Sequence, residues 1–256
     1  MEVSVLSSGS SGNCYYIEES DFAILIDAGL SCKQICQRLH LIGKTPKKIH
    51  AVFITHEHTD HVRGADVFAR TFKIPIFATP KTLQSKFICS NQELLIPLKK
   101  DQQLSLARLK IQTISKSHKA ADPVSFSITS KNKTISIITD LGFSCQNTIQ
   151  QIQKSDFLCL ESNHDLGMLM NGHYPYYLKK WISSDTGHLS NKQAALTILE
   201  YAPQNLSHLI LSHLSEHNNT PELALQTFQE ILSHRQSFNP QIEISSKHQP
   251  TQLFKI

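Results

Sequence analysis

The 256-residue sequence has only six cysteines, and their spacing does not suggest a disulfide framework. They include no Cys-x-x-Cys pair, which indicates reduced thiols of the kind found in cytoplasmic proteins. No apolar run approaches the roughly eighteen residues that a membrane-spanning helix needs. The N-terminus also lacks a basic segment followed by an apolar one. We therefore expect a soluble, cytoplasmic protein with no membrane partner.

Internal repeats, low-complexity tracts and flexible linkers are missing as well. The length allows a full hydrophobic core in one large domain or in two small ones. The formal net charge of +4 and the isoelectric point near 8.7 are mildly basic. Such a charge permits a polyanionic substrate, but many enzymes carry a similar one, so composition alone does not identify the substrate.

Strand-like and helix-like segments alternate along the chain, which predicts an α/β fold. The expected strands are Glu2–Leu6, Cys14–Glu18, Phe22–Ile26, Ala51–Ile54, Ile74–Ala78, Glu93–Leu98, Leu104–Ala107, Lys110–Ile114, Val124–Thr129, Thr134–Ile138, Phe157–Leu160 and His208–Leu211, with a final β segment. The expected helices are Ser31–Leu41, 62–72, Pro80–Phe87, Asn147–Lys154, Pro175–Ser184, Lys192–Tyr201 and Pro221–Leu232. The turn Ser7–Gly12 can bind an anion through backbone N–H groups or form a tight hairpin. The basic segment Lys44–Lys48 is either a solvated turn or a substrate contact.

One short segment concentrates potential metal ligands. The apolar run Ala51–Ile54 predicts a buried strand, and it is followed directly by His56, His58, Asp60 and His61. Side chains alternate in an extended segment, so His56 and His58 point to the same side. Imidazole and carboxylate ligands in this mixture suit zinc and neighbouring divalent ions. The alternative is a polar loop at a helix start that carries histidines by chance.

This His-x-His-x-Asp-His segment resembles the signature of the metallo-β-lactamase fold hydrolases. The other metal-site elements of that superfamily occur here in the same order, as Asp27, His118, Asp140 and His213, near the ends of expected strands. Within the superfamily the sequence is most similar to the WalJ/YycJ-type exonucleases. That similarity rests on the segments Ser8–Cys14, Glu161–Asp165, Gly187–Asn191 and Leu211–Ser215. The resemblance covers nearly all of residues 1–256, which favours a single domain.

The resemblance implies an αββα sandwich, with two mixed sheets flanked by helices and a dinuclear metal site at one edge. It implies that His56, His58 and His118 hold one divalent ion, that Asp60, His61 and His213 hold a second, and that Asp140 bridges the two. The expected metal is zinc or manganese, with iron as a further option. Two such ions, about 3.5–4 Å apart, can share one hydroxide and lower its pKa towards neutrality.

Two further residues acquire expected roles from the same resemblance. Asp27 is not a ligand in the family pattern, so we expect it to hydrogen-bond the metal loop, although it could also be an ordinary turn aspartate at a strand end. Lys119 departs from the family, which usually has aspartate after the third-motif histidine. A lysine at this position can contact a phosphate.

The substrate is a separate question, because this fold serves many reactions. The stretch between Asp140 and His213 is too short for the large insertion of ribonuclease J-type nucleases. The segment around His188 is similar to part of ribonuclease Z, which implies that His188 is a proton donor oriented by Glu161. The implied catalytic residues are thus His188, Glu161 and Asp60. The alternative for His188 is a structural role at a helix start.

We therefore expect a metal-dependent phosphodiesterase that acts on nucleic acid, with DNA as the expected substrate. The family resemblance implies 5′-exonuclease action. One alternative is a hydrolase of a small ester or thioester. Another is a metal-bound regulatory or scaffold protein without turnover.

Overall fold

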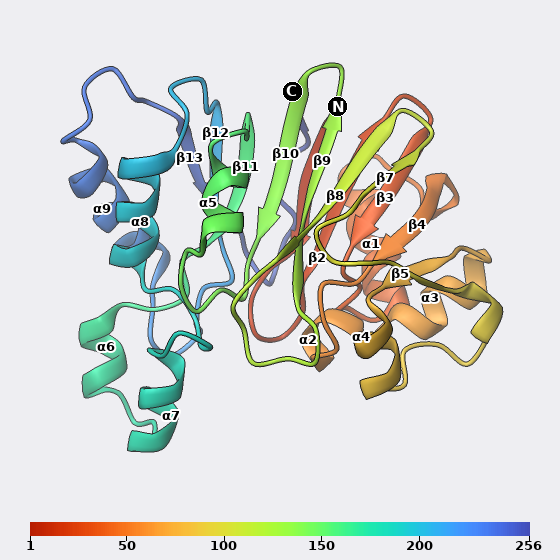
Figure 1. The fold of residues 1–256 in the computed structure, drawn as a ribbon, viewed down its shortest axis with the longest axis horizontal. Coiled ribbons are helices and arrows are strands. Elements are labelled where there is room, and N and C mark those ends of the chain that lie inside the picture. Colours follow the sequence, from red (N-terminus) through yellow and green to blue (C-terminus); the bar gives the residue numbers. More distant parts are fainter.

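Two seven-stranded sheets pack face to face in the computed structural model, which describes residues 1–256 (Figure 1). The first sheet has the order β14-β1-β2-β3-β4-β5-β6 and consists of β1 (Glu2–Ser7), β2 (Cys14–Glu19), β3 (Phe22–Ile26), β4 (Ile49–Phe53), β5 (Ile76–Ala78), β6 (Leu95–Pro97) and β14 (Phe254–Lys255). The second has the order β13-β12-β11-β10-β9-β8-β7 and consists of β7 (Gln103–Leu106), β8 (Leu109–Ser115), β9 (Val124–Ser130), β10 (Lys133–Ile138), β11 (Phe157–Glu161), β12 (His208–Ser212) and β13 (Gln241–Ile244).

Helices cover the outer faces of both sheets, which confirms the expected αββα sandwich (Figure 1). The helices are α1 (Cys32–Leu41), α2 (Thr59–Val62), α3 (Ala65–Phe72), α4 (Pro80–Ser85), α5 (Gln146–Ile152), α6 (Leu166–Asn171), α7 (Tyr176–Ile182), α8 (Asn191–Tyr201) and α9 (Pro221–Leu232). Apolar residues of α1 and α3 pack on the first sheet, and those of α5, α8 and α9 pack on the second. None of these helices is both long enough and apolar enough to span a membrane.

The strand sequences fit a sandwich because the central strands are buried on both faces. In β3, Ile24 and Ile26 pack into the core between the sheets, whereas Ala23 and Leu25 pack into the core beneath the helices. Successive side chains of a strand point to opposite faces, so a strand covered on both sides reads as a continuous apolar run.

The direction of the strands determines where the site lies. Strands β3 to β6 pair in parallel within the first sheet, and β10 to β13 do so within the second. Their carboxyl ends meet at one edge of the sandwich, the lower edge in Figure 1, while both chain termini lie at the upper edge. Ligands of open α/β sheets bind where strands end in this way.

The helix expected over residues 62–72 is present as α3, but it begins three residues later than expected, after the separate short helix α2. α2 ends at Val62 and α3 begins at Ala65, with Gly64 between them. A Cβ atom on Gly64 would lie 1.9 Å from the carbonyl oxygen of Leu30. The backbone can therefore approach Leu30 only at a glycine, and the chain changes direction at that point.

Several other expected boundaries also need correction. The expected strand Glu93–Leu98 is a 3₁₀ turn over Gln92–Leu94 followed by the short β6. The expected strand Leu104–Ala107 ends one residue early, because Ala107 has a φ of 51° in a turn. Helix α6 was not expected from the sequence. The six cysteines are all free, as expected.

The basic segment Lys44–Lys48 was expected to be a solvated turn or a substrate contact. Lys44 does not fit the first of these interpretations, because it is largely buried. Its Nζ forms ion pairs with Glu2 and Glu18, and the lysine side chain is only 14 % exposed. Burial opposes the charge of Glu18, but hydrogen bonds from Lys44, Tyr16 and Lys48 outweigh it and lower the pKa of Glu18 to about 2. The lysine therefore stabilises a buried carboxylate far from the site edge.

We expect Lys44→Ala to lower the free energy of unfolding by about 1–2 kcal/mol at pH 7, because it removes a charged donor from a buried acceptor. Lys48→Ala is the matched control and should cost less than about 1 kcal/mol, since Lys48 is half exposed. The stability from Glu18 is present above its ordinary pKa of 4.5 and disappears as the pH falls towards 2. Urea unfolding at pH 7 and pH 2.5 measures this, and equal losses for the two variants would contradict it.

Candidate metal centre

Seven predicted ligand side chains converge at the edge where the strands end. His56 and His58 lie in the loop after β4, Asp60 and His61 lie in α2, and His118, Asp140 and His213 follow β8, β10 and β12. All are buried except His58 and Asp60, which are partly exposed. The structure therefore brings together residues that lie up to 157 positions apart in the sequence.

One group of potential ligands consists of His56, His58 and His118, whose nitrogen atoms lie within 4.8 Å of one another. The Nε2 atom of His56 lies 3.0 Å from Nδ1 of His58. The Nε2 atom of His118 lies 3.4 Å from the same Nδ1. Three imidazoles thus present one nitrogen each to a common point.

A second group consists of Asp60, His61 and His213. Oδ2 of Asp60 lies 3.2 Å from Nε2 of His61 and 3.6 Å from Nε2 of His213. Asp140 lies between the two groups. Its Oδ2 is 3.4 Å from Nε2 of His61, and its Oδ1 is 3.5 Å from Nε2 of His213 and 3.9 Å from Nε2 of His118.

Hydrogen bonds behind the histidines set their tautomers. Nδ1 of His61 bonds Oδ2 of Asp27 at 2.7 Å, and Nδ1 of His118 bonds the carbonyl oxygen of Gly187 at 3.1 Å. Both oxygens can only accept, so each Nδ1 carries the proton and each Nε2 keeps a lone pair. These lone pairs face the site, which is the usual arrangement for a metal-binding histidine.

Asp27 also holds the metal loop, as expected from the sequence. Oδ1 of Asp27 accepts a hydrogen bond from the backbone N–H of Thr55 at 2.8 Å. The hydroxyl of Thr55 donates to the Asp27 carboxylate at 2.9 Å. The hydroxyl oxygen can then accept from Nδ1 of His56, 2.9 Å away, which leaves the Nε2 lone pair of His56 facing the site.

Glu161 is fully buried and lies close to Asp140, His188 and His213, and both of its oxygens are engaged in hydrogen bonds. Its Oε1 accepts hydrogen bonds from Nδ1 of His188 and Nδ1 of His213, both at 2.9 Å. Its Oε2 accepts from the backbone N–H groups of Leu141 and Leu189 at 2.9 and 3.0 Å. Burial alone would favour the neutral acid, but the neighbouring His188 and His213 outweigh it and hold the pKa of Glu161 well below its usual range. One carboxylate therefore orients both histidines.

Three site residues have backbone conformations that side chains rarely adopt. Asp27, Asp140 and His213 have φ values of 61°, 56° and 59°, in the left-handed region. Asp27 and His213 follow directly on a strand, and Asp140 follows one residue after β10, so all three lie at the edge of a sheet. Such conformations cost about 1–3 kcal/mol each and cluster at functional sites.

The electrostatics of the cluster fit bound cations. Burial lowers the pKa of His118 to about 3 and holds the pKa of His56 well below its ordinary value, so both are neutral, as a metal ligand must be. Burial also opposes a charge on His213, but Asp140, Asp60 and Glu161 outweigh it and raise its pKa to about 10. These carboxylates therefore stabilise a positive charge at this point.

Two buried atoms lack a hydrogen-bond partner at the centre of the cluster, namely Oδ2 of Asp140 and Nε2 of His213. Buried polar atoms normally have partners, so unpaired ones within a cluster of potential metal ligands call for a cation. Together with the convergent nitrogen lone pairs, these atoms could hold two divalent ions of the zinc or manganese type.

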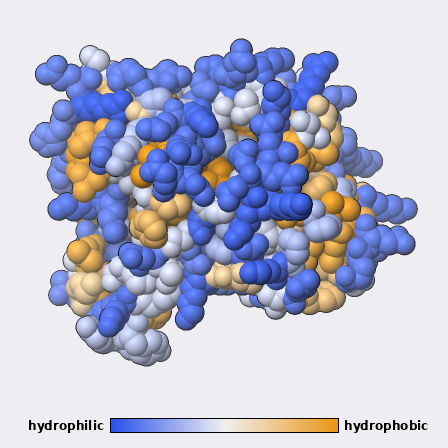
Figure 2. All heavy atoms as spheres, in the orientation of Figure 1, coloured by the Kyte–Doolittle hydropathy of each residue, from blue (hydrophilic) through white to orange (hydrophobic).

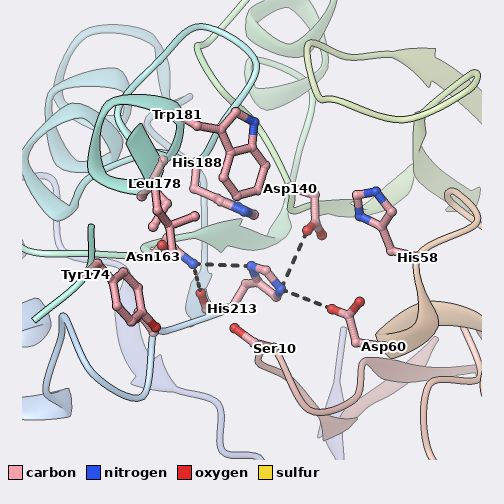
Figure 3. A pocket seen from close by; sticks show the side chains of 12 residues that line it. Ser10, His58, Asp60, Asp140, Asn163, Tyr174, Leu178, Trp181, His188 and His213 are labelled. Carbon is pink, nitrogen blue, oxygen red and sulfur yellow. Dashed lines mark hydrogen bonds and ion pairs between the residues drawn. The ribbon is translucent and has the colours of Figure 1, made fainter. Parts of the chain in front are cut away.

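A pocket of about 270 Å³ opens over the cluster (Figure 3). Asp140, Asp60 and His58 lie on one side of it, while His188 and Trp181 lie on the other. Trp181 meets the ring of His188 edge-on, with 5.6 Å between the ring centroids. His188 is therefore placed beside the cluster with its Nδ1 turned away towards Glu161.

Several residues of this pocket belong to no recognisable catalytic or metal-binding motif in the sequence. Asn163 donates a hydrogen bond to the carbonyl oxygen of His213 at 2.9 Å and so supports its left-handed turn. Tyr174, Leu178 and Trp181 come from α7 and the segment before it, and they form the wall opposite the metal ligands. The only signal in the sequence was indirect, because Asn163 lies in a segment that carries the family resemblance.

The turn Ser7–Gly12 forms a hairpin between β1 and β2, as one of the two interpretations predicted. This turn and the residue that follows it also hydrogen-bond to two of the predicted metal ligands. The Oγ atom of Ser8 accepts from the backbone N–H of His213 at 2.9 Å, and Nδ2 of Asn13 donates to Asp60 at 3.1 Å. Gly29 packs so closely here that a Cβ atom would lie 1.7 Å from the carbonyl oxygen of Asp60.

Comparison with known proteins agrees with this geometry. Residues 8–90 match the sequence model of the metallo-beta-lactamase superfamily. The chain is 35 % identical over 231 residues to the exodeoxyribonuclease WalJ of Streptococcus pneumoniae, covering 88 % of this chain and 85 % of that protein. It is 31 % identical over 243 residues to the exodeoxyribonuclease YycJ of Bacillus anthracis, covering 92 % and 90 %.

Solved structures show the same fold. The metallo-beta-lactamase fold protein YhfI of Bacillus subtilis superposes with a TM-score of 0.71 at 17 % identity and covers 98 % of both chains. At this identity the likeness concerns the fold alone. It agrees with the two helix-covered sheets described above.

Proposed function

The chain belongs to the metallo-β-lactamase superfamily, in the family of the exodeoxyribonucleases WalJ and YycJ, and from this membership we propose that it removes nucleotides from the 5′ ends of DNA as a metal-dependent phosphodiesterase. The observation that carries the proposal is the His188–Glu161 pair beside the ligand cluster. We further propose that residues 1–256 act as a single domain in the cytoplasm.

The ligand assignment follows the two groups of donor atoms. His56, His58 and His118 would hold one ion, Asp60, His61 and His213 would hold the other, and Asp140 would lie between them. The mixture of nitrogen and oxygen donors suits zinc or manganese, and iron is also compatible. When bound, such a pair supplies an activated water and offsets negative charge on the phosphate.

The surrounding residues keep these donors in place. Asp27, Thr55, Gly187 and Glu161 hold the Nδ1 atoms of four of the five ligand histidines, so each of those four rings presents one fixed nitrogen; the exception is His58, whose Nδ1 faces the cluster. Asn13 holds the Asp60 carboxylate from the other side. Because these contacts already fix the positions of the donor atoms, the site does not have to reorganise when the substrate binds.

His188 has the placement of a proton donor. Because ionised Glu161 only accepts, Nδ1 of His188 carries a proton and Nε2 is the atom left to face the pocket. From Nε2, His188 can protonate the oxygen that leaves when a phosphodiester breaks. An ester or thioester hydrolase has less need of such a donor.

The test compares substrates on one metal-loaded preparation. Manganese- or zinc-loaded protein should release mononucleotides from end-labelled, 5′-phosphorylated DNA faster than it hydrolyses lactones, thioesters or β-lactams. DNA binding should weaken steeply with salt, because phosphate contacts release counterions. RNA and DNA of both strand forms belong in the same assay. If a thioester were the only compound consumed, the proposal would fail, and if nothing were consumed, the chain would be a binding protein.

A further inference from the structure

A second pocket lies next to the metal centre and has no role in the function proposed so far. It has a volume of about 360 Å³ and is lined by His58, Lys119, Tyr177, Leu178 and Trp181. Three of these residues, His58, Leu178 and Trp181, also line the pocket over the metal ligands. The two pockets therefore adjoin, and a group bound in the second would be continuous with one bound at the metals.

The walls of this second pocket combine aromatic rings with a free cation. Tyr177 is 74 % exposed, so much of its ring is open to a ligand. Lys119 makes no ion pair, and its backbone N–H group is fixed by the carbonyl oxygen of Thr186 at 3.0 Å. Its side chain is thus available to an anion at the rim.

The arm that carries these aromatic residues stands apart from the two sheets. Helices α6 and α7 project at the lower left in Figure 1, and Figure 2 shows pale and orange tones among the blue in that region. Leu166, Met170 and Tyr176 are also about half exposed or more on this arm. Trp181 connects the arm to the reaction site, because its ring contacts His188.

A nucleotide matches this combination of groups. Its base is a flat ring that stacks on aromatic side chains whatever its identity, and its phosphate pairs with a lysine. We propose that this second pocket, the base pocket, stacks the base next to the scissile phosphate on Tyr177 and Trp181, while Lys119 contacts a neighbouring phosphate. This proposal rests on the proposed function, because it assumes that the substrate at the metals is DNA.

The fluorescence of Trp181, the only tryptophan in the chain, provides the test. Metal-loaded protein is titrated with a short, 5′-phosphorylated phosphorothioate oligodeoxynucleotide that resists cleavage. The matched ligand has the same backbone without bases. The oligodeoxynucleotide should quench Trp181 and bind on the order of tenfold more tightly than the abasic backbone, the usual effect of stacking one base.

Substitutions in and near the pocket test which residues cause this difference in affinity. Tyr177→Ala should weaken binding of the base-carrying ligand by about tenfold and leave binding of the abasic backbone unchanged. Tyr176→Ala is the matched control, since Tyr176 is 79 % exposed on the same helix but does not line the base pocket. Lys119→Ala should weaken both ligands and reduce the salt dependence, whereas Lys180→Ala, outside the pocket, should change neither.

Two results would contradict the proposal that this pocket binds a base. One is equal affinity of the wild type for both ligands, and the other is unchanged discrimination in Tyr177→Ala. The proposed function fails separately. If the wild type cleaved DNA without distinguishing the two ligands, only the base pocket would be refuted. If it distinguished them but hydrolysed thioesters alone, the base pocket would stand and the nuclease proposal would be refuted.

Discussion

Asp140→Asn should lower DNA hydrolysis by on the order of 10²–10³-fold, the loss typical of removing one preorganised electrostatic group. Asp140 is the one carboxylate that approaches ligand nitrogens of both groups. The amide keeps the size of the side chain, and asparagine tolerates the φ of 56° at this position, so the fold should survive. Bound metal should fall from about two ions per chain to one or none.

The control for this variant is Asp21→Asn, which changes the same charge at an exposed turn that precedes the amino end of β3, whereas the site lies at the carboxyl ends of the strands. It should retain activity and metal content. Thermal unfolding of the variants and inductively coupled plasma analysis of dialysed protein measure the two quantities. An Asp140→Asn protein that keeps both ions and normal turnover would contradict the assignment of Asp140 between the ions.

His188→Ala should keep the fold and both ions but lose roughly 10²–10⁴-fold activity on DNA, the usual contribution of a general acid. A nucleotide leaves as a poor alkoxide unless a donor protonates it. Bis(p-nitrophenyl) phosphate has a leaving group that departs without a proton, so its hydrolysis should suffer much less. His173→Ala is the control, because His173 is an exposed histidine in the segment between α6 and α7 and does not line the pocket.

The structure makes Glu161→Gln a less selective variant than His188→Ala. Glu161 also orients His213, and an amide would turn an N–H group towards one of its present donors. We expect this variant to lose some metal as well as the preference for DNA over the activated ester. Equal losses on both substrates for His188→Ala, with metal retained, would indicate that His188 contributes to binding instead of proton transfer.

The convergence of the predicted ligand side chains could be expected from the sequence, because their signal is local and their position is fixed by topology. His56, His58, Asp60 and His61 lie within six residues, and a strand before them could be recognised from its apolar run. Asp140 and His213 were placed only as residues at strand ends. Parallel strands bring such ends to one edge, so the convergence follows once the sheets form.

What the sequence did not predict depends on contacts between distant segments. The break between α2 and α3 arises because Gly64 touches Leu30, which no periodicity within 62–72 reveals. Lys44 looked like a surface residue in a basic segment, but β1 and β2 supply two carboxylates to it. Tyr177 and Trp181 acquire a role only because α7 lies beside His188 and Lys119.

Anomalous diffraction from crystals of the manganese-loaded protein tests the central claim most directly. The account predicts two peaks, about 3.5–4 Å apart, one among His56, His58 and His118 and the other among Asp60, His61 and His213, with Asp140 contacting both. Neither peak should contact Glu161 or His188. A single peak, or a metal ion bound by His188 and Glu161, would contradict the dinuclear assignment and the role of His188 as proton donor.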